Sequence, residues 1–261
     1  MPFITRNLLK YFTFDSFSEF GIPHGFFTRI GGCSPKPWES LNLATSVGDS
    51  RNNVLENRRR ILSALPRPQD SIFDVWQIHG NTVVIADKPR ENGSTHQKAD
   101  GIITSSPEIT LLMLFADCVP IFVFDPRNNV VAIAHAGWKG TVNRIGANLI
   151  NKLKNNFGTK PNEIIAGIGP SIGFDHYEIR QDVYVEAHVK LDQIAKSSIR
   201  YSGNQIHFDL KRANKEILKE QGVLRIEIAD ICTACNPFTW FSHRAENGKT
   251  GRFAGVLALP K

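Results

Sequence analysis

The chain has 261 residues, of which 41% are hydrophobic and 21% charged, and its formal net charge is +6. This composition is that of an ordinary globular protein and excludes a chain that is mainly disordered. The basic residues are scattered and form no long block, which argues against a basic arm that binds nucleic acid. We therefore expect no nucleic-acid partner, and the mild positive charge favours an anionic substrate.

Neither the cysteines nor the apolar residues indicate export or insertion into a membrane. The four cysteines, Cys33, Cys118, Cys232 and Cys235, are too few and too dispersed for a disulfide framework. Residues 1–14 lack the apolar core and the small-residue cleavage site of a secretory signal. No run approaches the roughly 18 apolar residues of a membrane span. We expect a cytoplasmic protein without a membrane partner.

The first strong strand signals surround His79. Residues 71–78 and 82–86 are rich in β-branched and aromatic side chains, and Gly80-Asn81 between them is typical of a tight turn. The two segments predict a β-hairpin with His79 at its turn.

The remaining pattern mixes strands with helices. Residues 109–115 are a continuous apolar run, typical of a strand buried on both faces. Further strands are predicted at 119–124, 130–134, 223–229 and 253–259, and helices at 141–157, 181–191 and 210–221. Gly158 would end the first helix, and the polar segments 31–37 and 87–100 predict loops. We expect one α/β (α+β mixed) domain over residues 1–261, with mixed β-sheets covered by helices.

Three side chains of the kind that bind metals lie where predicted strands end. His79 follows residues 71–78, Cys118 separates two apolar strands, and His135 directly follows residues 130–134. Strand ends are where a rigid scaffold presents functional groups. Two imidazoles and one thiolate suit zinc, and three protein ligands leave a position open for catalysis. Their spacing forms no compact motif, so a structural Cys118 and a surface His79 are the alternatives.

Two further segments have the residues of a binding site. Residues 137–141 precede the predicted helix, whose free N–H groups and dipole would attract an anion, although Thr141 would also serve as an ordinary N-cap. Cys232 and Cys235 form a CxxC pair, which occurs in zinc sites and in redox pairs. Because no second CxxC is present, a structural role for this pair is favoured.

Sequence motifs follow one another over nearly the whole chain. They comprise residues 24–32, 40–43, 77–80, 116–120, 135–141, 167–173, 177–178, 230–233, 241–244 and 250–252. The most specific are Ala116-Asp117-Cys118 and His135-Ala136-Gly137-Trp138. This set resembles the laccase-domain, or YfiH-like, family, once labelled multicopper polyphenol oxidases and now read as enzymes that metabolise purine nucleosides.

The resemblance implies a zinc site of His79, Cys118 and His135, which are also the catalytic residues, with copper as another possible metal. It implies phosphorolysis of adenosine, inosine and methylthioadenosine, together with deamination of adenosine. Purine nucleosides and phosphate would be the molecules bound. Lys139 stands where arginine is expected, which keeps the charge but loses the bidentate fork. His243 stands where tyrosine is common.

Six residues are expected to bind substrate, namely Asn42, Arg58, Lys139, Gly140, Thr141 and Arg252. In phosphorolysis, phosphate attacks C1′ of the ribose as the base departs, and both developing charges need electrostatic partners. Phosphate would rest at Gly140-Thr141 or on one of the basic side chains. Deamination requires an activated water at C6 of adenine, which is chemistry that zinc supplies. Asp117 would either orient a metal ligand or be a structural carboxylate.

A metal-free cysteine hydrolase is the first alternative to this function. Cys118 would be the nucleophile and His135 its base. Relatives in the family have been linked to the editing of peptidoglycan precursors, in which an amide to a misplaced serine is cut, so this hydrolase would be an amidase.

Two more functions would depend on different metal sites. A copper-dependent polyphenol oxidase is disfavoured because the eight histidines include no His-x-His pair, and only Met1 and Met113 would be available as an axial ligand. A non-enzymatic zinc protein would need a closed site with a fourth ligand from His24, His243 or Cys232.

Overall fold

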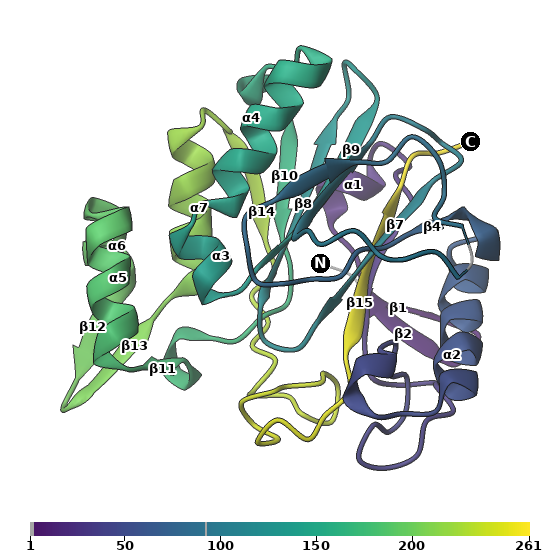
Figure 1. The fold of residues 1–261 in the computed structure, drawn as a ribbon, viewed down its shortest axis with the longest axis horizontal. Helices are drawn as coiled ribbons and strands as arrows, with labels where there is room; N and C mark the ends of the chain where they lie inside the picture. The colour runs from purple at the N-terminus through teal and green to yellow at the C-terminus, as the bar shows by residue number, and fades with distance from the viewer. Residues whose placement is uncertain (1–2, 92) are drawn as a thin grey trace.

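Two six-stranded mixed β-sheets form the centre of the protein (Figure 1), and the computed structural model describes residues 3–91 and 93–261. The first sheet has the order β1 (Phe3–Arg6), β2 (Leu9–Phe12), β3 (His24–Phe27), β15 (Phe253–Ala258), β7 (Thr110–Phe115) and β4 (Ile72–Phe73). The second has the order β14 (Arg225–Ile228), β10 (Ile165–Ile168), β8 (Val119–Asp125), β9 (Val130–Ala136), β6 (Gly101–Thr104) and β5 (Val83–Ile85). A third, smaller sheet has the order β11 (Glu178–Ile179), β13 (Gln205–Phe208) and β12 (Ile199–Ser202).

Helices cover the outer faces of the two large sheets (Figure 1). The α-helices are α1 (Asp15–Ser18), α2 (Arg51–Ala64), α3 (Trp138–Val142), α4 (Ile145–Phe157), α5 (Gln181–Leu191), α6 (Gln193–Ser198) and α7 (Leu210–Glu220). Short 3₁₀ turns lie at Thr45–Val47, Gln69–Ser71, Pro161–Glu163 and Phe174–His176. Helix α4 contacts β9 and α7, whereas α2 contacts β2 of the first sheet. None of the helices in the described part of the chain has the length and apolar run needed to cross a bilayer.

Alternating side chains on β7 divide the apolar core into layers. Leu111, Met113 and Phe115 belong to the cluster between the two large sheets. Leu112 and Leu114 point the other way and pack in the cluster beneath α2. Both faces of β7 are therefore covered, which explains why residues 109–115 form a continuous apolar run. Each fully buried side chain of this size stabilises the fold by about 1.5–3 kcal/mol.

The same alternation on β9 positions a candidate functional residue. Ala132 and Ala134 face the layer beneath α4 and α7, whereas Val131 and Ile133 face the first sheet. His135 continues the second set, so its ring lies between the sheets, with its centroid 5.6 Å from that of Phe115. The position of this imidazole therefore follows from strand periodicity.

The predicted hairpin around His79 is wrong. Strand β4 pairs with β7 in the first sheet, whereas β5 pairs with β6 in the second. The chain between them crosses from one sheet to the other, and the backbone N–H groups of residues 78–80 donate to the buried carboxylate of Asp100. The backbone of this turn is thus bonded to the side chain of Asp100, in place of the hairpin pairing that the local pattern predicts.

The helix predicted at 141–157 begins earlier and is interrupted. Gly137 is the N-cap of α3, so Thr141 lies inside this helix and does not cap it. Arg144 has a left-handed φ of 58° and separates α3 from α4. The two helices pack on different neighbours, since α3 contacts α5 and α7 while α4 contacts β9. Gly158 ends α4 with a φ of 67°, as predicted.

The other predicted strands and helices are present with small shifts at their ends. Helix α5 spans the predicted residues 181–191, α7 ends one residue early, and the strands predicted from 109 to 134 correspond to β7, β8 and β9. The loops at 31–37 and 87–100 contain no helix or strand in their described residues, and residue 92 lies outside these. The expected class, mixed sheets covered by helices, is confirmed.

Candidate metal centre

The structure brings together the three predicted metal ligands, two at the neighbouring strands β8 and β9 of the second sheet and one in the turn that crosses between the sheets. Their ligand atoms all lie within 4.8 Å of one another. Cys118 directly precedes β8, His135 lies near the end of β9, and His79 occupies the turn between β4 and β5. His135 is buried, Cys118 is partly buried and His79 is exposed, so the group opens to solvent on one side. The centroids of the two imidazole rings are 4.9 Å apart.

Asp100 holds two of these ligands in place. Its Oδ1 accepts hydrogen bonds from His135 Nδ1 at 2.9 Å and from the backbone N–H of His79 at 3.0 Å. The carboxylate thereby fixes the His135 tautomer and leaves Nε2 free to bind a metal. Burial raises the pKa of Asp100, but the hydrogen bonds from His135 and from the Gly80 N–H outweigh this and hold the pKa below its usual range. Asp100 is therefore an ionised partner of the candidate ligand His135.

A glycine makes room for the group. A Cβ atom added to Gly137 would lie 3.0 Å from Cys118 Sγ and 3.1 Å from His79 Cδ2. The Gly-Trp turn after β9 therefore has to remain without a side chain at this position. The donor set of two imidazole nitrogens and one thiolate suits zinc and is also acceptable to copper. The residues present fit a bound transition metal.

Cys118 and His135 stabilise opposite charges on each other. Burial opposes a charge on either side chain. The neighbouring positive imidazole nevertheless holds the pKa of the Cys118 thiol below its usual range. The neighbouring thiolate likewise raises the pKa of His135 above its usual range. The thiolate form, which is the form that binds metals and acts as a nucleophile, is therefore favoured at neutral pH.

The backbone is left-handed at two turns of the site. His79 has a φ of 57° and Asp117, directly before Cys118, has a φ of 83°. Such conformations cost energy for residues other than glycine and occur often at functional sites. The Asp117 carboxylate accepts hydrogen bonds from the Thr233 hydroxyl and the Arg244 N–H, both at 2.7 Å. These bonds hold Asp117 in the turn before Cys118, and the carboxylate that orients a candidate metal ligand is Asp100.

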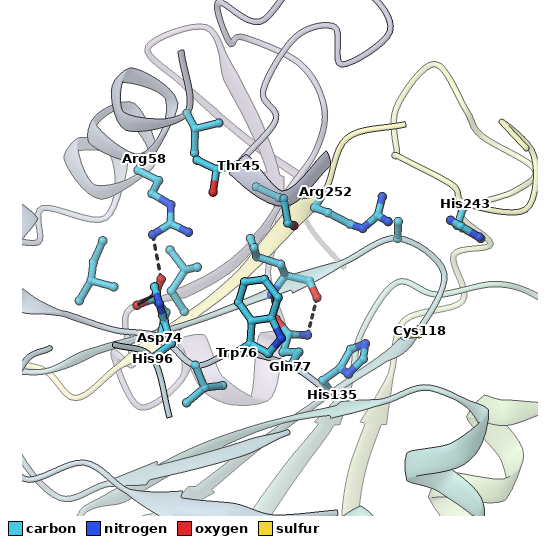
Figure 2. Close-up of a pocket in the computed structure, with 18 of the residues that line it drawn as sticks. Thr45, Arg58, Asp74, Trp76, Gln77, His96, Cys118, His135, His243 and Arg252 are labelled. Carbon is cyan, nitrogen blue, oxygen red and sulfur yellow. Dashed lines mark hydrogen bonds and ion pairs between the residues drawn. The ribbon is translucent and has the colours of Figure 1, made fainter. Parts of the chain in front are cut away.

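A cavity of about 1300 Å³ extends away from the three ligands. Figure 2 shows the Arg58–Asp74 ion pair at one end of the view, Cys118, His135 and His243 toward the other, and Trp76 between them. Trp76 is 53% exposed although it lines the cavity. The cavity therefore presents an aromatic surface near the three candidate metal ligands.

Two of the arginines on the cavity wall, Arg58 and Arg252, differ in how their charge is balanced. Arg58 donates to Asp74 Oδ2 at 2.8 Å. Arg252 donates to the carbonyls of Thr250 and Gly251, and among residues 3–91 and 93–261 it forms no ion pair with a carboxylate. Burial lowers the pKa of Arg252, while the charges of Cys118 and Asp117 act in the opposite direction. Arg252 is therefore the better placed of the two to bind an anion.

The other residues expected to bind substrate do not line the cavity. Asn42 is buried, and its Oδ1 accepts the backbone N–H of Arg252 at 2.9 Å. Lys139 is exposed and lies over the ring of Trp138. Gly140 and Thr141 are buried inside α3, which corrects the premise of an anion site at a helix start there.

None of the three candidates for a fourth ligand joins the group. His24 is buried in the core, where its Nε2 accepts the Phe14 N–H at 2.8 Å. Cys232 belongs to a separate cluster with His176 and Cys235. His243 lines the cavity but is not among the three grouped ligand atoms. In the described part of the chain the group thus has three members, which leaves a position open.

The sequence offered little indication of three residues at the site. Asp100 ends a polar loop, and only the fold shows that its carboxylate reaches residues 78–80 and His135. Trp76 resembles a strand residue of the predicted hairpin. Gln77 lies in one of the matching motifs, and its side-chain amide exchanges two hydrogen bonds with the backbone of Leu114. Each of these roles depends on contacts between distant segments.

The fold and a three-ligand His/Cys centre define a mixed α/β protein with a candidate metal-dependent active site. Residues 23–260 match the family described as multi-copper polyphenol oxidoreductase laccase. The chain belongs to this family, as the motifs indicated.

Named relatives support this assignment. A Bacillus subtilis protein named purine nucleoside phosphorylase YlmD is 36% identical over 250 residues, which cover 90% of this chain and 87% of the relative. A purine nucleoside phosphorylase of Deinococcus radiodurans is 35% identical over 240 residues, which cover 92% of this chain and 90% of the relative. The crystal structure of YlmD from Geobacillus stearothermophilus superimposes with a TM-score of 0.90 at 30% identity and covers 100% of both chains.

Proposed function

We propose that this protein is a zinc-dependent purine nucleoside phosphorylase that also deaminates adenosine. The observation that carries the proposal is the grouping of His79, Cys118 and His135 at the wall of a cavity that also contains Trp76 and Arg252. Relatives of similar length carry the name purine nucleoside phosphorylase. The substrates proposed are adenosine, inosine and methylthioadenosine, with phosphate as the second substrate.

Different cavity residues bind the two substrates, the purine nucleoside and phosphate. The exposed indole of Trp76 offers a flat surface on which a purine base stacks, an interaction worth about 1–3 kcal/mol per base. Arg252 supplies a guanidinium without a carboxylate partner among the described residues, and such a group suits phosphate. A zinc ion held by the two histidines and Cys118 would supply Lewis-acid chemistry beside the bound substrates.

In phosphorolysis, a phosphate oxygen forms a bond to C1′ while the bond from C1′ to the purine nitrogen breaks. The purine leaves with the bonding electrons and gains a proton. The positive charge that develops on the sugar is next to the phosphate, and Arg252 holds the phosphate in place. In the deamination of adenosine, water replaces the amino group at C6 and ammonia leaves. Asp100 keeps His135 oriented throughout both reactions.

The proposal is tested by metal content and product release. The purified protein is analysed for zinc and copper and then assayed for hypoxanthine from inosine plus phosphate. The assay is run before chelation, after chelation and after zinc is restored. His135→Ala should abolish hypoxanthine release from inosine and the conversion of adenosine to inosine, with the fold retained. His188→Ala is the matched control, because this histidine bonds to the Tyr184 carbonyl in α5 and does not line the cavity. Normal turnover by His135→Ala would refute the proposal.

One observation favours a second candidate, a Cys/His amidase. Asp100, His135 and Cys118 form a continuous chain of interactions, as in hydrolases in which a carboxylate orients the histidine that activates a thiol. Cys118 Sγ would attack the carbonyl of an amide to serine in a peptidoglycan precursor, and His135 would protonate the departing amine. Water would then hydrolyse the thioester. Chelator-resistant amide cleavage that is lost on alkylation of Cys118 would favour this candidate.

A further inference from the structure

A second cluster of soft ligands lies outside the cavity. The ligand atoms of His176, Cys232 and Cys235 lie within 4.8 Å of one another. The Nδ1 atom of His176 is 3.8 Å from Cys232 Sγ and 3.6 Å from Cys235 Sγ. His176 and Cys235 are exposed and Cys232 is partly buried, so a metal ion can reach the cluster from solvent.

These distances are close to those of a tetrahedral zinc site. Zn–S bonds of about 2.3 Å and Zn–N bonds of about 2.05 Å at a tetrahedral angle separate the sulfur and nitrogen atoms by roughly 3.5 Å. The two observed separations therefore require little movement of the side chains. A CxxC pair alone is ambiguous, but the structure adds a histidine more than fifty residues away in the sequence.

The backbone around the cluster holds two loops together. Ser171 and Cys232 form a parallel β-bridge, and the Thr233 N–H donates to the Ser171 carbonyl at 3.1 Å. The Gly173 N–H donates to Cys232 Sγ at 3.1 Å, as backbone amides do around zinc-bound thiolates. A Cβ atom at Gly173 would lie 3.1 Å from the same sulfur, so this turn also has to remain without a side chain.

The local charges also suit a cation. Two thiolates would each contribute a negative charge, and the charge of Asp175 acts on Cys235 as well. Lys211 is the opposing cation, and its ammonium group donates to the carbonyls of Ala229 and Ile231. A bound Zn²⁺ replaces the two thiol protons, and Asp175 adds a negative charge beside the ion.

We propose that His176, Cys232 and Cys235 bind a second zinc ion, separate from the one at His135, that joins the loop at 173–177 to the loop at 232–235. Water or the Asp175 carboxylate completes its coordination. This site is distinct from the catalytic proposal and does not depend on it.

The second ion would stabilise the wall of the cavity. Thr233, between the two cysteines, donates to Asp117, which precedes Cys118. Arg244 donates to the His176 carbonyl at 3.1 Å and to the backbone of Glu178 at 3.0 Å. Arg244 lines the cavity, as does Tyr177, the neighbour of His176. An ion that links the two loops therefore holds residues of both sites in position.

The test counts zinc ions per chain under reducing conditions. Wild-type protein is loaded with zinc, desalted and analysed for bound metal, and we expect two ions. Cys235→Ser and His176→Ala should each bind one, and His135→Ala should lose the other ion and retain this one. Cys33→Ser is the matched control, since Cys33 is an exposed free cysteine outside both groups, and it should bind two.

Cobalt provides a second readout that does not depend on activity. Metal-free wild-type and His135→Ala proteins are titrated with Co²⁺. Absorption from cobalt–thiolate bonds should persist in His135→Ala but disappear in the double variant that combines His135→Ala with Cys235→Ser. Because His176→Ala alters an exposed side chain, it serves if the cysteine variant does not fold. Unchanged zinc content in both Cys235→Ser and His176→Ala would overturn the proposal. A protein in which Cys232 and Cys235 form a disulfide even under reducing conditions would also overturn it.

Discussion

The carboxylate of Asp100 accepts a 2.9 Å hydrogen bond from His135 Nδ1, and the same side chain accepts the backbone N–H groups of residues 78–80. One buried carboxylate thus orients the ring of one candidate metal ligand and shapes the turn that carries another. His135 lies on β9 of the second sheet, whereas His79 lies in the turn that crosses from the first sheet to the second, and Asp100 is hydrogen-bonded to both.

Replacing Asp100 with asparagine should weaken zinc binding by about 10- to 100-fold. Asparagine keeps only one acceptor oxygen, and its NH2 group would face either the donors on His135 and His79 or the backbone N–H groups of residues 78 and 80. Zinc affinity is measured by competition with a chromogenic chelator. Asp125→Asn is the matched control. The buried Asp125 carboxylate accepts two backbone N–H groups and the Thr159 hydroxyl away from the site. Both variants should be less stable, but equal zinc affinities would contradict the role given to Asp100.

Gly137→Ala should disrupt zinc binding more than it disrupts the fold. The added Cβ would approach Cys118 Sγ at 3.0 Å and His79 Cδ2 at 3.1 Å, so the ligands must move apart. Gly146→Ala in α4 is the control, because its Cβ would make ordinary contacts of 3.5 Å with Leu218 of α7 and 3.6 Å with Ile121 of β8. That change should stabilise the helix by up to about 1 kcal/mol. Calorimetric zinc titration together with thermal unfolding distinguishes the two effects, and full zinc affinity in Gly137→Ala would contradict the prediction.

Arg252→Ala should raise the KM for phosphate by about 10- to 150-fold, the equivalent of the roughly 1.5–3 kcal/mol of a hydrogen bond to a charged group. The KM for inosine should change much less. Lys139→Ala is the control, since Lys139 is exposed and does not line the cavity. Initial rates at varied phosphate provide the comparison. A larger effect from Lys139→Ala than from Arg252→Ala would restore the phosphate site expected beside residues 140–141.

Trp76→Ala should raise the KM for inosine by about 5- to 150-fold if the base stacks on the indole, which corresponds to roughly 1–3 kcal/mol. Trp76→Phe should retain most of the affinity. The thermal stability of both variants should be close to that of the wild type because the side chain is 53% exposed. Phe238→Ala, at a residue that is 91% exposed and does not line the cavity, is the control. Unchanged inosine kinetics in Trp76→Ala would remove this residue from the proposed site.

Asp74→Asn should destabilise the protein at neutral pH and have less effect in acid. Burial raises the pKa of Asp74, but the charge of Arg58 and the hydrogen bond from Arg90 at 2.6 Å outweigh burial and hold the pKa below its usual range. The stabilisation from a lowered carboxyl pKa is complete above the unfolded value of about 3.9 and disappears as the pH falls through the native value.

We expect a loss of roughly 2 kcal/mol at pH 7, less than for a fully buried ion pair because both arginines are partly exposed. Urea unfolding at pH 7 and near pH 3 measures the difference between Asp74→Asn and wild type. Lys88→Met, which removes an exposed ion pair with Glu91, should change stability little at either pH. A difference at Asp74 that stays constant with pH would contradict the mechanism.

The central strands and the candidate ligands could be predicted from sequence because their signals are local. The apolar run at 109–115 requires a strand covered on both faces, and β7 is such a strand. Gly158 follows the apolar period of α4 and ends it. His79, Cys118 and His135 could be nominated from their chemistry and from the family motifs. Helix α2 escaped prediction because its sequence, RNNVLENRRRILSA, contains few apolar residues.

Only the tertiary structure decided how these pieces combine, because the deciding contacts join residues far apart in the chain. The two strands of the predicted hairpin belong to different sheets, and the turn between them is hydrogen-bonded to Asp100. Packing on different neighbours interrupted the predicted helix at Arg144 and placed Thr141 inside α3. The fold also placed His176 beside the CxxC pair. A side chain's local pattern determines which element it belongs to, but the partners that give it a function are set by packing between elements.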